Sequence, residues 1–212
     1  GIRRMYERGE DVFYYLTMMN EKYPQPAMPE GAREGIVKGM YRLRPAGDGQ
    51  PRVHLLGSGA ILNEAVKAQA ILADGFGMSA DVWSVTSYKE LYRDAHEAER
   101  WNMRHPGEEP RTAYISQCLD EAPAVAATDY VQAVPDTVTR WVPGRFVTLG
   151  TDGYGRSDGR DSLRDFFEVD ARHIALAALH ALAREGQFAT EDLGRAAEQM
   201  YIDPDKPPPS KL

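Results

Sequence analysis

Residues 53–85, VHLLGSGAILNEAVKAQAILADGFGMSADVWSV, carry the pattern that decides the fold. A short apolar run, Val53–Leu56, ends in Gly57-Ser58-Gly59, and apolar residues then recur at helical spacing through Ile61–Ala73. Gly75 and Gly77 are typical helix stops, and a second apolar run follows at Asp81–Val85. A strand, a helix and a strand in this order form a crossover unit, which predicts two parallel strands in one sheet.

Outward from this unit, strand and helix patterns keep alternating. Further strands are predicted at Ile36–Leu43, Ala124–Thr128 and Phe146–Leu149, and helices at Tyr88–Met103 and Ile174–Leu182, with Thr190 capping another. This alternation predicts a three-layer α/β/α fold around a mixed, mostly parallel five-stranded sheet, because apolar strands need helices on both faces. Ile36–Leu43 is the expected antiparallel strand, since no crossover helix separates it from Val53–Leu56.

The two ends of the chain differ from its middle. Asp11–Thr17 is an aromatic, β-favouring run that predicts a strand whose sheet lies elsewhere. Three prolines between residues 20 and 35 predict an extended linker, because proline fixes φ and lacks a donor. We therefore expect a strand and linker in residues 1–35, the α/β domain in 36–202, and a Pro-rich, extended or disordered tail in 203–212. Residues 1–35 should be poorly anchored or pair with another chain.

Composition and charge exclude several classes of function. The 212 residues hold 25 Lys and Arg against 32 Asp and Glu, a net charge of −7 that disfavours nucleic-acid and membrane-surface partners. No apolar run reaches the roughly 20 residues of a membrane span, so we expect a cytoplasmic protein. A single cysteine, Cys118, cannot form an internal disulfide, and the five histidines lack the close pairing of a metal motif.

Two shorter motifs have structural explanations. Gly57-Ser58-Gly59 occupies the place of a phosphate-binding loop, but Leu62 stands where the dinucleotide fingerprint needs a third glycine. We interpret it as a tight strand-to-helix turn. The charged run Glu97–His105 has helical spacing, which indicates a solvated or interface helix without catalysis.

The best candidate site is the loop from Gly150 to Arg164, which follows the last predicted strand. Carboxyl ends of parallel strands are where doubly wound sheets place ligands. Ser157 or Asp158 is expected to cap the following helix, and arginines recur every four residues beside acidic ones. The candidate residues for an interface or an anion site are Asp152, Arg156, Ser157, Asp158, Arg160 and Arg164. We favour an ion-paired interface over a ligand site, because the loop lacks a titratable pair suited to acid–base work.

Longer stretches carry a resemblance to a known family. They are Pro26–Gly31, Leu56–Gly59, Asp81–Ser87, Glu99–Met103, Ala122–Ala126 with Thr128–Tyr130, and Leu149–Asp158. Through them, nearly end to end, the chain resembles the C-terminal part of the homodimeric pyruvate dehydrogenase decarboxylating components of the transketolase superfamily. The resemblance implies a transketolase-type C-terminal domain from about Ile36 onward. It also implies that residues 1–35 are the last strand of a pyrimidine-binding domain and its linker.

The same resemblance implies what the longer parent protein does. The parent would use thiamine diphosphate and Mg²⁺ to decarboxylate pyruvate and to acetylate lipoyl groups of an acyltransferase component. The family's Gly-Asp-Gly to Asn-Asn cofactor signature has no match here, because Gly150-Thr-Asp-Gly153 interrupts the triplet and no Asn pair occurs. We therefore expect no catalytic, cofactor or metal residue in this segment, and no cofactor binding or activity when it is isolated.

The segment itself would then serve assembly, the homodimer interface and the entrance to the active site. Its partners would be the remaining domains of the subunit, the homodimer mate and the lipoyl acyltransferase component. Two alternatives stay open. One is a free-standing α/β module that binds a phosphorylated or carboxylated effector at residues 150–164. The other, an independent hydrolase or dehydrogenase, is disfavoured because the chain lacks a nucleophile motif and a dinucleotide fingerprint.

Overall fold

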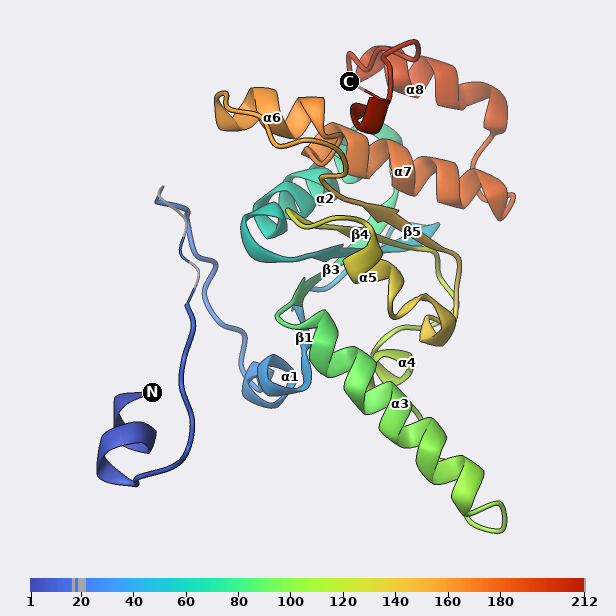
Figure 1. Cartoon of the computed structure of the whole chain (residues 1–212). Coiled ribbons are helices and arrows are strands. Elements are labelled where there is room, and N and C mark those ends of the chain that lie inside the picture. Colours follow the sequence, from blue (N-terminus) through green and yellow to red (C-terminus); the bar gives the residue numbers. More distant parts are fainter. Residues whose placement is uncertain (17, 19–21, 212) are drawn as a thin grey trace.

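A computed structural model describes residues 1–16, 18 and 22–211 of the chain, and within them a mixed sheet forms the centre (Figure 1). Its strands are β1 (Met40–Arg44), β2 (Arg52–Gly57), β3 (Ser79–Val85), β4 (Ala124–Ala127) and β5 (Phe146–Leu149). They lie in the order β1-β3-β2-β4-β5, and only the β1–β3 pair is antiparallel. The predicted five-stranded, mostly parallel sheet with an antiparallel first strand is confirmed.

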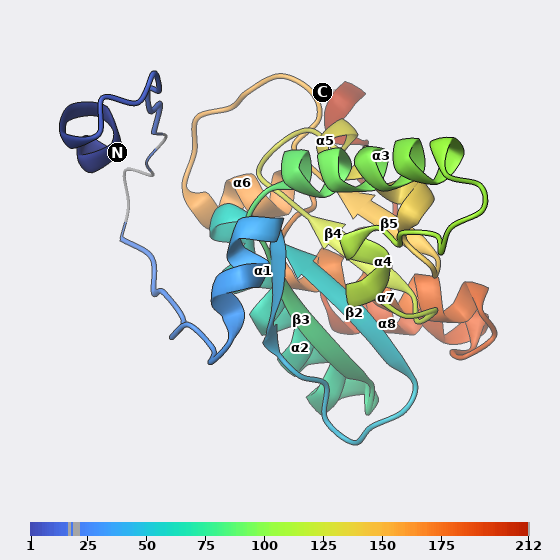
Figure 2. The same ribbon diagram turned by 90° about the horizontal axis from the view of Figure 1, so that it is seen from below.

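Helices cover both faces of this sheet, which gives the three predicted layers (Figure 2). One face carries α2 (Leu62–Phe76), α7 (Ala171–Arg184) and α8 (Leu193–Gln199), and the short α6 (Arg160–Phe166) lies at its edge. The opposite face carries α1 (Ala32–Lys38), α3 (Tyr88–Arg104), α4 (Tyr114–Cys118) and α5 (Ala133–Asp136). Single turns of 3-10 helix occur at Gly59–Ile61, Thr139–Trp141, Thr190–Asp192 and Pro209–Lys211.

Alternation along the strands divides the buried residues between two cores. Val53, Leu55 and Val82 face α2 and α7, whereas Leu56 and Trp83 face α3 and α4. Burying one such aliphatic side chain stabilises the fold by about 1.5–3 kcal/mol. The near-continuous burial of β2, β3 and β4 follows from these strands being covered on both faces.

The first predicted strand is wrong over its first half. Residues up to Lys38 belong to helix α1, and the strand begins only at Met40. Gly39 ends the helix at φ 108°, a left-handed conformation, and a Cβ there would lie 2.6 Å from the backbone oxygen of Ser87. Helix α1 therefore runs across residue 35, where the linker was expected to end.

The N-terminal segment forms no strand within its described residues. Residues Arg3–Glu7 form one π-helical turn, and residues 12–16 follow without regular structure, while residue 17 of the expected strand lies outside the described residues. Phe13, Tyr15 and Leu16 are 87%, 85% and 78% exposed, and their ribbon stands apart from the sheet (Figure 1). A strand needs a neighbouring backbone to bond with, and the sheet of this chain does not reach the segment.

The helix caps also differ from expectation. The segment at Thr190 begins as a 3-10 turn, after which α8 starts at Leu193, and neither has a side-chain cap within the described residues. Before α6, Asp158 accepts a hydrogen bond from the amide of Gly159 at 2.6 Å and does not reach into the helix. The tail is not simply extended: it ends in the turn Pro209–Lys211 and packs beside the loop that follows β5, within 3 Å of where a Cβ of Gly153 would lie.

Candidate functional site

Strand order decides where a ligand crevice can form. Strand β2 pairs with β3 on one side and with β4 on the other, so the crossovers that leave β2 and β3 run in opposite directions. In doubly wound sheets this reversal opens a crevice at the carboxyl ends of the strands. Here Ser58, after β2, donates a hydrogen bond to the hydroxyl of Thr128, after β4, at 2.7 Å. The two strand ends are thereby joined at the switch point.

The turn after β2 approaches this point closely. A Cβ on Gly57 would lie 2.6 Å from the Cα of Leu62, so the chain can enter α2 here only with glycine. This is the tight strand-to-helix turn that we expected. Gly59 has φ 56° and lies beside Asp129, the residue that follows Thr128.

Asp129 carries a buried carboxylate oxygen without a partner. Its Oδ2 accepts no hydrogen bond from any described residue. Burial raises the pKa of the Asp129 carboxyl above its ordinary value, and the charges of Arg164 and Arg160 together with the amide of Ala60 offset part of that rise. The hydroxyl of Thr151, after β5, donates to the backbone oxygen of Asp129 at 2.6 Å, which ties the ends of β4 and β5 together.

The three predicted arginines and Asp129 line one cavity. Arg156, Arg160 and Arg164 line a space of about 240 Å³ at the carboxyl edge of the sheet. The rest of the lining is Tyr23, Asp129, Thr151, Gly155, Leu163, Phe167 and Val169. The four-residue spacing is helical only for Arg160 and Arg164, because α6 begins at Arg160 and Arg156 reaches the cavity from the preceding loop.

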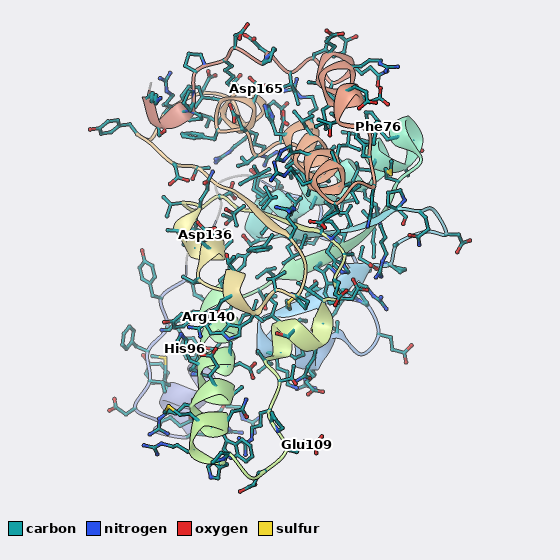
Figure 3. The ribbon with its side chains drawn as sticks, turned by 90° about the vertical axis from the view of Figure 1, so that its right-hand side faces the viewer. Phe76, His96, Glu109, Asp136, Arg140 and Asp165 are labelled. Carbon is teal, nitrogen blue, oxygen red and sulfur yellow. The ribbon has the colours of Figure 1, made fainter. Side chains whose placement is uncertain are left out.

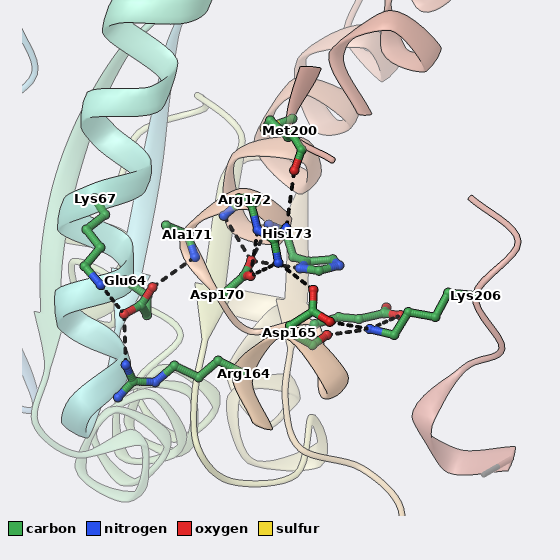
Figure 4. Close-up of polar contacts among 11 residues, drawn as sticks. Glu64, Lys67, Arg164, Asp165, Asp170, Ala171, Arg172, His173, Met200 and Lys206 are labelled. Atoms are coloured by element: carbon green, nitrogen blue, oxygen red, sulfur yellow. Dashed lines mark hydrogen bonds and ion pairs between the residues drawn. The ribbon is translucent and has the colours of Figure 1, made fainter. Parts of the chain in front are cut away.

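Arg164 is paired within its own chain (Figure 4). Its Nη1 lies 3.0 Å from Oε1 of Glu64 on α2, and the two side chains are only 11% and 5% exposed. Glu64 also accepts hydrogen bonds from Lys67 at 2.9 Å and from the amide of Ala171 at 3.2 Å. Tyr23 covers the other side of the guanidinium, with its hydroxyl 3.4 Å from Nη2.

Arg156 differs from Arg164 in having no acidic partner among the described residues. Its guanidinium lies 4.0 Å from the centre of the Phe166 ring, and the residue is exposed. The remaining candidates lie elsewhere. Asp152 accepts from the amide of Gln132 at 3.0 Å, and Ser157 and Asp158 are exposed and do not line the cavity.

A second cluster of charges lies behind α6, where Figure 4 shows Asp165, Asp170 and His173 close together. Asp170 caps α7 by accepting from the amides of Arg172 and His173, both at 3.0 Å. Burial alone would raise the pKa of Asp170, but the hydrogen bonds from His173 and Arg172 hold it well below its ordinary value. The guanidinium of Arg172 bridges Asp165 and Asp170, so this cluster already contains its cation.

A polar cluster that was not predicted from the sequence lies near the amino-terminal ends of β2 and β3. His54 is 2% exposed, and its Nδ1 accepts from the Trp83 indole at 3.2 Å while Nε2 donates to Asp120 at 2.9 Å. Burial lowers the pKa of His54 to about 4, so the ring stays neutral. Asp81, on the neighbouring strand, accepts from Arg52 at 3.0 Å. The alternation of polar and apolar residues along both strands was the signal that could have revealed this cluster.

The charged run on α3 is explained by surface contacts. Figure 3 shows His96 and Arg140 close together on one side of the molecule, far from Asp165. The ring of His96 lies 5.0 Å from that of Trp141, and Glu99 accepts from both Arg140 and the indole of Trp141. These contacts account for the run without catalysis.

Fold and site together define an α/β domain with a doubly wound, mixed sheet and an arginine-lined cavity at its switch point. The model of the transketolase-like TK C-terminal domain family matches residues 39–170. The chain belongs to this family. Its fold is similar to that of transketolase from Leishmania mexicana, with a TM-score of 0.50 and 18% identity over 71% of this chain and 19% of that one.

More similar relatives carry the name pyruvate dehydrogenase E1 component. The protein of this name from Pseudomonas aeruginosa is 48% identical over 210 residues, which cover 97% of this chain and 24% of the relative. The one from Escherichia coli is 49% identical over 208 residues, covering 97% and 23%. The chain thus spans about a quarter of the length of these curated relatives. Within the described residues, no helix combines the length and apolar character that crossing a membrane requires.

Proposed function

We propose that the chain is the C-terminal segment of the decarboxylating subunit of a pyruvate dehydrogenase. The parent would decarboxylate pyruvate with thiamine diphosphate and Mg²⁺ and transfer the acetyl group to lipoyl groups of an acyltransferase component, in the cytoplasm. The observation that carries the proposal is the alignment of 97% of the chain, at 48% identity, with a pyruvate dehydrogenase E1 component. Such an extended match is much more specific than any short motif.

The described residues do not fit the cofactor or its metal. Mg²⁺ bound to a diphosphate needs free oxygen ligands in near-octahedral geometry. Asp129 faces Arg160 and Arg164, Asp152 is bonded to a backbone amide, and Arg172 bridges Asp165 and Asp170. The cofactor would therefore belong to other domains of the subunit, and we derive no chemical step from this chain.

The role of the segment is then assembly. In this proposal residues 1–35 end the pyrimidine-binding domain and its linker, residues 36–202 form the C-terminal domain, and residues 203–212 are the tail. The exposed side chains of Phe13, Tyr15, Leu16 and Met18 support it, because apolar residues gathered on one segment mark a surface that another domain covers.

The loop from residue 150 to 164 would face the homodimer mate near the active-site entrance. Tyr154 is 89% exposed there, and exposed tyrosine and arginine are enriched in interfaces. In the full-length polypeptide, Tyr154→Ala should raise the dimer dissociation constant at least tenfold in sedimentation equilibrium. Tyr201→Ala, which removes an equally exposed tyrosine from the end of α8, serves as the matched control.

The decisive experiment uses the full-length polypeptide that contains this chain. Purified with thiamine diphosphate and Mg²⁺, it should acetylate a lipoyl domain in a pyruvate-dependent reaction, and the 212-residue chain should not. A full-length protein that turns over a sugar phosphate but not pyruvate would contradict the proposal. A second candidate, a free-standing module for an anionic effector, is favoured by the arginine-lined cavity.

A further inference from the structure

The cavity at the switch point is lined by one acid and one base with unused bonding capacity. Oδ2 of Asp129 is buried and accepts no hydrogen bond from any described residue. Arg156 has no acidic partner among them, and its guanidinium packs on the Phe166 ring. Both side chains line the same space of about 240 Å³. A buried acceptor without a partner is destabilising, so a ligand that brings a donor to Asp129 is favoured.

The other two arginines of the cavity do not enter its charge balance. Arg164 forms an ion pair with Glu64 at 3.0 Å, and Arg160 already interacts with another group of the chain. One carboxylate, on Asp129, and one guanidinium, on Arg156, therefore remain for a ligand. Because these two charges are opposite, an anion or a cation would pair with one of them and leave the other unpaired. A zwitterion pairs with both.

Size and apolar lining restrict the zwitterion to a small amino acid. The space of about 240 Å³ is smaller than the roughly 300–1,000 Å³ of sites for drug-sized ligands. Leu163, Phe167 and Val169 form an apolar wall of the cavity, which suits a short aliphatic side chain. An α-amino acid also carries its ammonium and carboxylate groups close together, so both can lie within one small cavity.

We propose that this cavity binds a small aliphatic amino acid, whose ammonium group donates to Asp129 and whose carboxylate pairs with Arg156. The guanidinium offers the carboxylate paired N–H donors, and the ammonium group supplies the donor that Asp129 lacks. The ligand is carboxylated, as in the second candidate function, but it has no net charge. Its binding is a property of the chain itself and does not depend on the pyruvate dehydrogenase assignment.

Valine and two of its analogues test each charged group of the ligand separately. Isovalerate lacks the ammonium group of valine and isobutylamine lacks the carboxylate, while both keep the branched hydrocarbon chain. Titrated into the 212-residue chain in a calorimeter, valine should bind at least tenfold more tightly than either analogue. Each analogue leaves either Asp129 or Arg156 without its partner, which is the reason for the weaker binding.

Two variants assign these groups to their partners. Arg156→Gln should weaken valine binding at least tenfold and leave isobutylamine binding unchanged, because isobutylamine has no carboxylate. Asp129→Asn should weaken valine binding to the same extent and leave isovalerate binding unchanged. Arg111→Gln removes another exposed arginine stacked on an aromatic ring, and this control should change none of these affinities. Circular dichroism of each variant confirms that it is folded.

Equal affinities for valine and either analogue, an unaltered affinity for valine in the Arg156 variant, or no binding of valine would overturn the inference. If Asp129→Asn does not fold, the comparison of valine with isovalerate in the unchanged chain still tests the ammonium contact. None of these outcomes bears on the activity of the full-length polypeptide, so the two proposals fail separately.

Discussion

Replacing Glu64 with glutamine tests how the cavity wall is held in place. Glu64 is buried on α2 and accepts hydrogen bonds from Arg164, Lys67 and the amide of Ala171. Removing one partner of a buried ion pair costs about 3–5 kcal/mol, because the other charge stays buried without compensation. The amide oxygen of glutamine can keep one hydrogen bond, and the Lys67 side chain is 60% exposed and loses little. We therefore expect Glu64→Gln to lower the free energy of unfolding by about 2–4 kcal/mol in urea titrations.

Two further variants separate this effect from a general loss of charge. Glu64→Leu combined with Arg164→Met removes both charges, so it should recover most of the lost stability. Glu34→Gln breaks the exposed pair with Lys38 on α1 and should leave the stability essentially unchanged, because solvent screens that pair. A loss below about 1 kcal/mol in Glu64→Gln, or a double variant as unstable as the single one, would refute the reasoning.

Three other predictions concern the rest of the fold. Burial lowers the pKa of His54 to about 4, so as the pH falls from 6.5 the unfolded chain takes up the histidine proton before the folded chain does. The free energy of unfolding should therefore fall by up to about 3 kcal/mol between pH 6.5 and pH 4, and His54→Gln should remove this pH dependence. Asp170→Ala deletes the cap of α7 and should cost about 1–2 kcal/mol in thermal unfolding, while Asp170→Asn should cost less. Gly57→Ala should prevent stable folding as judged by circular dichroism, because its Cβ would lie 2.6 Å from the Cα of Leu62, whereas Gly75→Ala meets nothing within 4 Å and should be tolerated.

The sequence predicts best those strands and helices in which apolar residues recur at regular spacing. The unit from β2 through α2 to β3 was predicted from 53–85 because its strands are apolar throughout and its helix buries one face. Helix α1 was missed because its short segment, AREGIVK, has a β-favouring Ile-Val pair and owes its ends to Gly31 and Gly39, both left-handed. The cap at Asp170 was missed because a local Asp signal cannot be told from a surface acid without knowing where α7 begins.

The location of the candidate site could be predicted from the sequence, but the full set of residues that form it could not. The rule that ligands lie at carboxyl strand ends indicated residues 150–164, and the structure puts Arg156, Arg160 and Arg164 around one cavity there. Asp129 was not predicted, because it lies 27 residues before Arg156 and joins it only through the pairing of β4 with β5. Likewise, Glu64 meets Arg164 across 100 positions of sequence. Such contacts depend on topology, which local patterns do not contain.

The point at which α6 begins explains why Arg156, Arg160 and Arg164 line a cavity and do not form a single row along one helix. Had the helix begun at Arg156, its guanidinium would share a face with Arg160 and Arg164 and point along one line. The loop delays the helix to Arg160, so Arg156 approaches from a different direction and meets the other two around a volume. Glu64 pairs with Arg164 at 3.0 Å, and the guanidinium carbon of Arg156 lies 4.0 Å from the centre of the Phe166 ring. Two of the three cations are thus positioned by contacts with Glu64 and Phe166, at the end of the sheet where the crossovers reverse direction.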